Sequence, residues 1–485
     1  MMEKSFTKEY VFLYNVENNF CRSKSTYDRK DTRTWLNRTF AAIGTRHVQV
    51  LFMFALLTIG IGMRVQFSVA LVAMTDRTSS KNPDVPVYDW NNKGVLLSSF
   101  FWGYAILQIV AALMARVHGS KVLLIASMAT NAVICCSIPT VAKLMGSYGV
   151  MACRAIMGLA QGFFYPSIYG VLTNWVPSSE RAHLGSSALA GVPFGIITGM
   201  SITGFISASW GGWPCSFYFY GMLGFLWIIG YYVAGASSPA LHPKITEKEK
   251  TFIENDASRN ETKAKVPWTA IMTSPAFWAI FFSYIGQSWG YQTLLSELPV
   301  YMNKVMKFNI ETNGILSATP YLIMFIIIIF TGYFSDYLIN NEYLTVKQSR
   351  CIFNSLATFG PAIGLVALSF MPETAVIPCV IMLIIAVGTQ GASSSGFEIN
   401  SMDISPNFAE ILIAFSNAAS EVFSNLGPLA VQFVVTDETN KAQWRIIFLA
   451  AAASYVLTST IFIIFMRADV QPWNNTDKEN DENKA

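Results

Sequence analysis

Long apolar runs recur along the whole chain, and each can cross the hydrocarbon core of a membrane, which takes roughly 20 residues of helix. The runs lie at 48–74, 94–114, 122–142, 149–175, 185–209, 215–236, 272–296, 314–334, 350–371, 377–397, 410–435 and 444–466. Lipid offers backbone N–H and C=O groups no hydrogen-bond partners, and none of the runs alternates as a barrel strand does. The sequence therefore predicts an all-α membrane protein with twelve transmembrane helices.

The composition agrees with a membrane protein. Of the 485 residues, 53% are hydrophobic and 13% are charged, whereas roughly 25% of the residues in an average soluble domain are charged. The seven cysteines show no metal or redox spacing, and most lie in or beside apolar runs, so we expect them to be packing residues. The bilayer is the expected solvent for most of the chain.

The lysines and arginines predict the orientation in the membrane. If both termini lie on the inner side, most of the 33 basic residues fall in inner segments, chiefly the N-terminal tail and the loop 237–266. Inner loops of membrane proteins carry this excess of positive charge. We therefore expect both termini in the cytoplasm.

A polar interval divides the apolar runs into six and six. The predicted organisation is a cytoplasmic tail at 1–46, a helix bundle at 47–236, a linker at 237–266, a second bundle at 267–466 and a tail at 467–485. Two six-helix halves with a site between them near the bilayer midplane are a known plan of secondary transporters. The division therefore favours a transporter.

Two smaller features fit this division. The linker stretch EKEKTFIE at 247–254 predicts a short surface helix with Thr246 as its N-cap. Short charged turns are expected at 113–121 and 332–336, at matching places after the second and eighth spans. This match suggests a duplicated architecture.

Arg64 lies near the middle of the first apolar run. A central arginine costs roughly 2.5–3.5 kcal/mol on insertion scales, so it needs a partner or a wet cavity. A guanidinium is always charged and offers a rigid fork of donors to carboxylate or phosphate. Arg64 is therefore a candidate anion ligand, and a structural ion pair between helices is the alternative.

Arg154 lies about one turn into the fourth run, and Gln161 follows seven residues later on roughly the same helical face. Such a pair is expected to face the protein interior rather than lipid. Arg154 could bind an anion, act in a gate or form a structural pair. Snorkelling towards the outer surface is a further possibility for its long side chain.

Acidic residues in the last spans are the second group of candidates. Glu421 lies near the centre of the eleventh run, where a carboxylate is either paired with an arginine or protonated. Glu398 and Glu410 lie near the predicted cytoplasmic ends of their spans, where solvated cap or surface roles are expected. Asp336 and Asp403 are expected in cytoplasmic turns with structural roles.

Catalysis has no support in the sequence. All four histidines fall at predicted cytoplasmic helix ends or loops, which argues against a histidine relay through the membrane. No metal-ligand spacing, nucleophile constellation or phosphate-binding glycine loop is present. We expect neither an enzyme nor a bound cofactor or metal.

Several stretches then occur in a recognisable order. They are SSFFWGY at 98–104, YP at 165–166, WVP at 175–177, ER at 180–181, FYFYG at 217–221, SPALHP at 238–243, WGY at 289–291, LLSELPVYM at 294–302, NGILSATPYL at 313–322, DISP at 403–406, SN at 416–417 and QPW at 471–473. Together they resemble the anion:cation symporter family of the major facilitator superfamily. That family includes vesicular glutamate transporters, sialin and sodium–phosphate cotransporters.

The resemblance runs from about residue 45 to 473 and implies the major facilitator fold. It also implies that spans one, four, seven and ten line a central cavity, and that alternating access is driven by protons, sodium or the membrane potential. By the same resemblance, Arg64 and Arg154 contribute to anion handling. Tyr104 and Asn400 match positions that line or brace the cavity.

The departures from the family pattern bear on coupling and cargo. The family commonly has a glutamate at the position of Gln161, where it is linked to coupling and to pairing with the arginine that Arg154 matches. The glutamate-transporting branch has an arginine at the position of Gln287 and histidines at those of Leu97 and Tyr169. These differences argue against glutamate as cargo, and other stretches look more like the sialin-like and phosphate-cotransporter branch.

The sequence thus predicts a secondary active transporter of small organic or inorganic anions, of the phosphate or carboxylate class. The expected binding residues are Arg64, Arg154, Gln161, Gln287, Asn400 and Tyr104. Glu421 is the coupling candidate, since it could take over the acidic role that Gln161 cannot perform. The coupling cation would be a proton or sodium, the membrane plasma or lysosomal–vesicular, and no nucleic-acid partner is expected. The alternative is an anion-gated channel or sensor that does not concentrate its ligand.

Overall fold

The computed structural model describes residues 44–75, 79–90, 92–256, 266–304, 310–372, 376–424, 430–431, 433–437 and 440–474. The chain divides into two compact units, Met1–Thr45 and Arg46–Ala485. Nearly all of the described residues belong to the second unit.

The first half of this unit consists of helices that correspond to the first six apolar runs. They are α3 (Thr45–Thr75), α4 (Lys93–Ile106), α5 (Gln108–His118), α6 (Ser120–Gln161), α7 (Phe164–Trp175), α8 (Arg181–Leu189), α9 (Gly191–Ser207) and α10 (Gly212–Ala234), with the 3-10 turn η1 (Ser178–Glu180) before α8. The linker carries η2 (Pro239–Leu241) and α11 (Glu247–Asp256), and the short helix α12 (Trp268–Thr273) follows it at the start of the second half.

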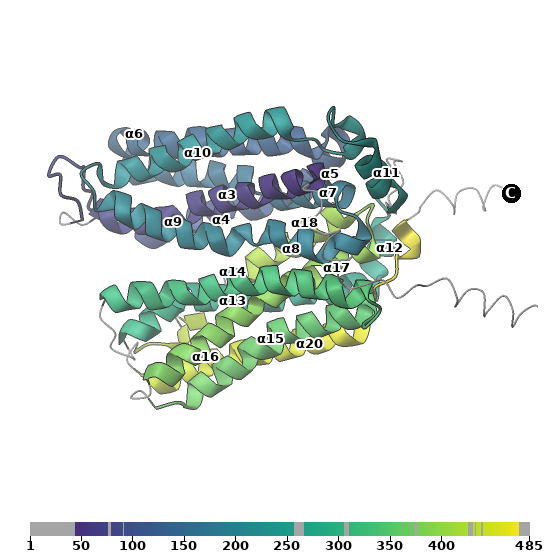
Figure 1. The fold of residues 1–485 in the computed structure, drawn as a ribbon. Coiled ribbons are helices and arrows are strands. Elements are labelled where there is room, and N and C mark those ends of the chain that lie inside the picture. Colours follow the sequence, from purple (N-terminus) through teal and green to yellow (C-terminus); the bar gives the residue numbers. More distant parts are fainter. Residues whose placement is uncertain are drawn as a thin grey trace, which may run out of the picture. The chain divides into compact units, whose positions relative to one another are not determined.

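The second half repeats this pattern with one strongly broken span. Its elements are α13 (Pro275–Lys304), α14 (Ile310–Asn340), α15 (Val346–Phe370), α16 (Val376–Gly388), η3 (Thr389–Ser395), α17 (Phe397–Ile404), α18 (Ala409–Ser424), α20 (Lys441–Phe465) and η4 (Pro472–Asn474). Figure 1 shows the purple-to-teal helices of the first half in one group and the green-to-yellow helices in another.

Within the described residues, eight helical segments are long and apolar enough to cross a membrane, and the bent pair α4–α5 makes a ninth. One of the eight, Ser120–Trp175, has 56 residues, so a straight helix would be ~84 Å long, against a hydrocarbon core of ~30 Å. It breaks at Gly146, where φ is 63°, and supplies two spans. α13 and α18 pack against each other among these spans, which completes the predicted twelve.

Glycines allow α4 and α6 to pack closely. A Cβ on Gly158 would overlap the carbonyl oxygen of Phe100, and a Cβ on Gly103 would overlap the backbone of α6. Small residues at such contacts are typical of helix packing in membranes. The close approach brings the aromatic side chains of α4 next to Arg64.

The two halves meet along a few elements. α8 and α9 pack against α14, while α18 packs against α5 and α7; α8 and α14 also lie side by side in Figure 1. We call the end of the bundle that carries α11 the linker end, and the end that carries residues 79–90 the loop end. α14 reaches the linker end with its last turns.

Local structure confirms one of the smaller predictions and corrects another. The linker helix is present as α11, and Thr246 Oγ1 accepts a hydrogen bond from the Glu249 backbone N–H at 3.4 Å. The charged turns are wrong in extent, because α5 continues to His118 and α14 continues past Asp336 to Asn340. Asp403 likewise lies on a helix, α17.

Candidate functional site

A cavity of about 180 Å³ lies between the two halves. The first half lines it with Ile61, Arg64, Val65, Tyr165, Leu189, Val192, Pro193 and Ile196, and the second half with Tyr284, Gln287, Ser288, Tyr291, Gln292, Met324, Ile328, Ser393, Ser394, Phe397, Glu398, Asn417, Glu421 and Ser424. Apolar walls with a few polar groups are typical of small-ligand sites. The charged side chains among these lining residues are Arg64, Glu398 and Glu421.

Arg64 projects from α3 into this cavity and pairs with Glu421 of α18. Its Nη2 lies 3.7 Å from Glu421 Oε2. The guanidinium carbon also lies 4.5 Å from the ring centre of Phe101 and 5.1 Å from that of Phe100, within the range of cation–π attraction. A carboxylate from the other half and aromatic faces therefore offset the cost of burying this cation.

Arg154 stands behind Arg64 rather than in the cavity. Its Nη1 donates a hydrogen bond to the Arg64 carbonyl oxygen at 3.2 Å, and its guanidinium carbon lies 4.4 Å from the ring centre of Phe67. Arg154 is 3% exposed, and no described side chain forms a salt bridge with it. It adds a second buried positive charge beside the cavity.

Gln161 and Asn400 are both buried outside the cavity lining. Gln161 Nε2 donates to the Gly60 carbonyl oxygen at 2.9 Å and to Asn131 Oδ1 at 3.2 Å. Asn400 Nδ2 donates to the Arg467 carbonyl oxygen at 2.9 Å. These hydrogen bonds hold helices and the C-terminal segment together, so the structure does not bring the two amides to Arg64.

Gln287 and Tyr104 lie closer to the expected site. Gln287 lines the cavity and donates Nε2 to Gln390 Oε1 at 3.3 Å. The Tyr104 hydroxyl accepts a hydrogen bond at 3.1 Å from Asn417, whose amide lines the cavity and also donates to Gln108. Tyr104 thus braces the cavity wall from behind.

The expectation of solvated roles for Glu398 and Glu410 is wrong. Glu410 is 1% exposed and lies 3.6 Å from Arg116 Nη1, because the first turn of α18 packs against the other half rather than against water. Glu398 lines the cavity and accepts a hydrogen bond from Ser393 Oγ at 2.6 Å. Glu398 faces the cavity because the α-helix of span ten ends at Gly388 and the 3-10 helix η3 follows it, which changes the direction of the side chains beyond.

Ionic contacts join the halves at the linker end. Asp403 Oδ1 lies 3.1 Å from Nη1 of Arg181 in the first half, and its Oδ2 lies 2.7 Å from Arg350 Nε in the second. Asp336 accepts hydrogen bonds from the backbone N–H groups of Ala182 and His183 at 3.1 and 2.8 Å. The two aspartates therefore have structural roles, on helices instead of turns.

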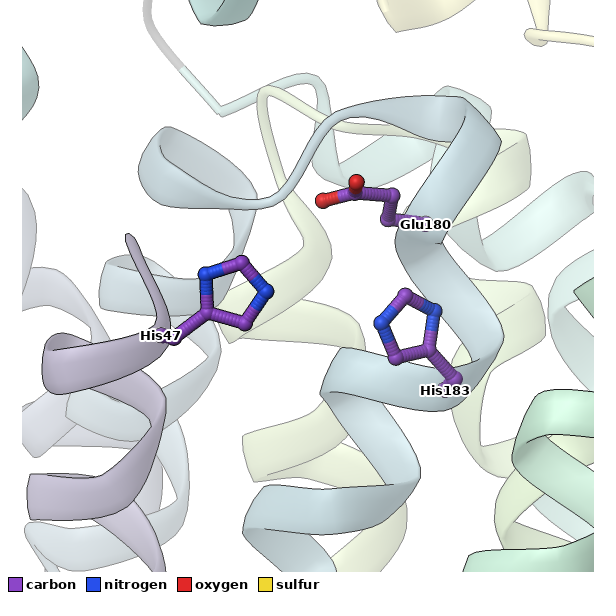
Figure 2. Close-up of side chains that lie close together, drawn as sticks. All are labelled: His47, Glu180 and His183. Atoms are coloured by element: carbon purple, nitrogen blue, oxygen red, sulfur yellow. The ribbon is translucent and has the colours of Figure 1, made fainter. Parts of the chain in front are cut away.

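His47, Glu180 and His183 bring two imidazoles and a carboxylate together at the linker end (Figure 2), with ligand atoms within 4.8 Å of one another. These residue types bind zinc in other proteins. Both Glu180 oxygens already accept hydrogen bonds from Arg46, at 2.6 and 3.0 Å, and His183 Nδ1 lies 3.0 Å from Asp336 Oδ2. A guanidinium on the carboxylate disfavours a further cation, so we interpret the cluster as a structural ionic network.

Tyrosines are the part of the site that sequence reasoning missed. Tyr165 lines the cavity from α7, and Tyr284 and Tyr291 line it from α13. A signal was present, because Tyr284, Gln287 and Tyr291 follow the three- and four-residue spacing of one helix face. Ser393 and Asn417 carry no comparable periodic signal.

Comparison with known proteins places this architecture in a family. The model of the Major Facilitator Superfamily matches residues 50–428. A putative inorganic phosphate cotransporter of Drosophila ananassae is 34% identical over 443 residues, covering 86% of this chain and 92% of that protein. Sialin of Homo sapiens is 32% identical over 434 residues, covering 85% and 87%.

A solved structure shares the fold. The proton:xylose symporter XylE superposes with a TM-score of 0.66 at 14% identity, over 89% of this chain and 99% of that one. The twelve-helix all-α architecture and its family are thus confirmed. The chain belongs to the Major Facilitator Superfamily, among the relatives of sialin and the putative inorganic phosphate cotransporters.

Proposed function

We propose that the chain is a secondary active transporter of small organic or inorganic anions, of the phosphate or carboxylate class, that works by alternating access. One observation carries this proposal: Arg64 faces the cavity between the halves, where its partner is the carboxylate of Glu421. A guanidinium that pairs with a carboxylate there can pair with an anionic cargo in the same way. The names of the relatives agree with an anion.

The cargo would compete with Glu421 for Arg64. An anion that replaces this carboxylate breaks a contact between α3 and α18, and therefore between the two halves. Arg154 strengthens the positive potential at this point, and Gln287 and Asn417 offer amide groups to the cargo. Binding in a partly dehydrated cavity makes such contacts stronger than they would be in water.

Glu421 also supplies the charge-pairing part of the acidic role that Gln161 cannot perform. Without cargo, the partly buried guanidinium of Arg64 and the buried one of Arg154 lie 5.1 and 5.0 Å from the centre of the same ring, that of Phe100, and Glu421 compensates Arg64. An unpaired buried charge is costly, so an empty transporter needs such a carboxylate. Gln161, Asn400 and Tyr104 support the site by holding its walls.

The proposed topology places the linker end and both termini in the cytoplasm, since most basic residues fall on that side. The loop end would face the outside of the cell or the lumen of an organelle. Transport would be driven by a proton or sodium gradient or by the membrane potential, in the plasma membrane or a lysosomal–vesicular membrane.

Uptake into proteoliposomes tests the proposal. Radiolabelled inorganic phosphate, an acidic monosaccharide and an acidic amino acid are supplied in turn with imposed sodium, proton and voltage gradients. Concentrative uptake of one anion is expected, together with loss of that uptake in Arg64→Gln and retention in the exposed linker variant Lys248→Gln. Flux that never exceeds equilibrium would favour an anion-gated channel, and absence of any anion flux would overturn the proposal.

A further inference from the structure

Glu398 is the carboxylate in the cavity whose charge is not compensated. It accepts a hydrogen bond from Ser393 Oγ at 2.6 Å, and no described basic side chain forms an ion pair with it. Other buried or partly buried acids of the bundle differ in this respect: Glu421 pairs with Arg64, Glu410 with Arg116, and Asp403 with two arginines. The contrast singles out Glu398 from the acids of the bundle.

Groups packed around Glu398 are phenols rather than cations. Tyr165 and Tyr169 of α7 and Tyr284 of α13 lie within electrostatic range of its carboxylate. Charged groups on the neighbouring helices are already engaged, since His183 of α8 binds Asp336 and Arg350 of α15 binds Asp403. On α18, Glu421 is held by Arg64. An ionised Glu398 would therefore remain an isolated negative charge.

The backbone is interrupted at this residue. Span ten runs as α16 to Gly388, continues as the 3-10 helix η3, and resumes as α17 at Phe397. Gly396 sits at the joint, where a Cβ would lie 2.9 Å from the Asn354 backbone nitrogen. Discontinuous helices at the midplane hold coupling ions in other transporter folds. The N-terminus of so short a helix favours the ionised carboxylate only weakly.

Given the proposed anion transport, we propose that Glu398 is the binding site of a coupling proton. Glu398 is partly buried in a cavity with mostly apolar walls. A carboxylate that is partly removed from water and has no cationic partner is stabilised in its neutral form, and a proton neutralises it directly. Sodium fits this site less well than a proton, because a hard cation needs several oxygen ligands. Among the described residues, Ser393 Oγ is the one side-chain oxygen that is hydrogen-bonded to the Glu398 carboxylate.

Glu398 would bind and release one proton in each transport cycle. Glu398 takes a proton from water on the loop-end side, and its charge goes from −1 to zero while the cargo binds Arg64. When the linker end opens, the carboxyl releases the proton to water on that side. The Tyr169 hydroxyl donates to the Glu398 backbone oxygen at 3.3 Å and so links this segment to the other half. Coupling thereby moves from span four, where Gln161 cannot titrate, to span ten.

Transport assays in proteoliposomes test this assignment in the full chain, with inorganic phosphate as the probe and the membrane potential clamped. An inward gradient of one pH unit can support up to about tenfold accumulation through one coupled proton. Glu398→Gln should abolish this accumulation and retain counterflow of phosphate between equal pH values. Glu398→Asp should keep both, as should Glu254→Gln on the exposed face of α11.

Accumulation by Glu398→Gln at the wild-type level would overturn the assignment, as would phosphate uptake driven by sodium and indifferent to the pH gradient. Absence of phosphate counterflow in the wild type would show that phosphate is not the cargo, and would leave the assignment of Glu398 to the next measurement. Infrared difference spectra between acid and alkaline buffers then test the protonation of Glu398 directly, because this measurement needs no cargo. A carboxyl C=O band that titrates in the wild type and vanishes in Glu398→Gln is expected, and its persistence would overturn the assignment.

Discussion

Arg64 of α3 and Glu421 of α18 form an ion pair across the central cavity, with Nη2 and Oε2 3.7 Å apart. The two side chains are 18% and 16% exposed, so each is open to the cavity while most of its surface is covered. A contact of this length is a moderate electrostatic attraction rather than a tight hydrogen-bonded fork. It is strong enough to compensate Arg64 and weak enough for a cargo anion to replace it.

Glu421→Gln should therefore raise the apparent affinity for the cargo. Removing the competing carboxylate should make the free energy of cargo binding more favourable by about 0.5–1 kcal/mol, which corresponds to a roughly two- to fivefold lower KM. Initial rates of uptake against cargo concentration measure this, with Glu421→Asp as the charged control. A higher KM with normal expression would show that Glu421 helps to hold the cargo instead of competing with it.

The linker end should have to open during transport. Asn340 Nδ2 of α14 donates to the Ser179 carbonyl oxygen at 2.7 Å, so the two positions are adjacent across the halves. With Ser179→Cys and Asn340→Cys combined, a short bifunctional thiol reagent should block uptake. Each single variant and the wild type, which carries native cysteines, should retain uptake under the same treatment. Full transport by the cross-linked protein would contradict alternating access at this end.

The sequence predicted the fold well because its main signal is long-range and repeated. The twelve apolar runs predict twelve helices because a bilayer requires apolar helical spans, and the spacing and N-cap of EKEKTFIE predict the linker helix. Arg64 and Glu421 stood out because a charge in an apolar run must be compensated. That they compensate each other could not be read from spacing, since they are 357 positions apart (421 − 64).

The failures concern one change of helical period and two contacts between segments that are far apart in the sequence. Glu398 was expected near solvent because a regular helix through span ten would put it at the cytoplasmic end; the 3-10 segment η3 redirects it into the cavity. Gln161 shares a helix face with Arg154, but that face meets the α3 backbone, whose Gly60 carbonyl takes its hydrogen bond. The partner of Glu410 is Arg116 of the other half, and the sequence around Glu410 contains no pattern that predicts this contact.

Gly158→Ala should destabilise the first half. Its Cβ would overlap the carbonyl oxygen of Phe100, so α4 would have to move away from α6. Overpacking of this kind costs about 1–3 kcal/mol, which thermal unfolding of the purified protein measures. Gly94→Ala is the matched control, since a Cβ there meets nothing within 4 Å. Equal melting temperatures for the two variants would contradict the close packing.

Asp403→Asn should have a larger effect on stability. Asp403 is 6% exposed and neutralises both Arg181 and Arg350. Its loss leaves two guanidiniums close together with no shared carboxylate, for which a cost of about 3–5 kcal/mol is typical. Asp469→Asn, at an exposed position, serves as the control. A shift in melting temperature no larger than that of the control would show that the halves are not held through Asp403.

Gln161→Glu should lower stability and, in a protein that also carries Glu398→Gln, should not restore coupling. The amide donates to two acceptors, the Gly60 carbonyl and Asn131 Oδ1, and an ionised carboxylate would face both of them without a proton to donate. Leaving these buried acceptors unsatisfied costs about 1–3 kcal/mol. Gln161→Leu loses the same hydrogen bonds without adding charge, so the difference between the two melting temperatures isolates the charge. If the double variant Gln161→Glu/Glu398→Gln were stable and accumulated phosphate under a pH gradient, span four would still be competent for coupling, and the transfer of that role to span ten would be wrong.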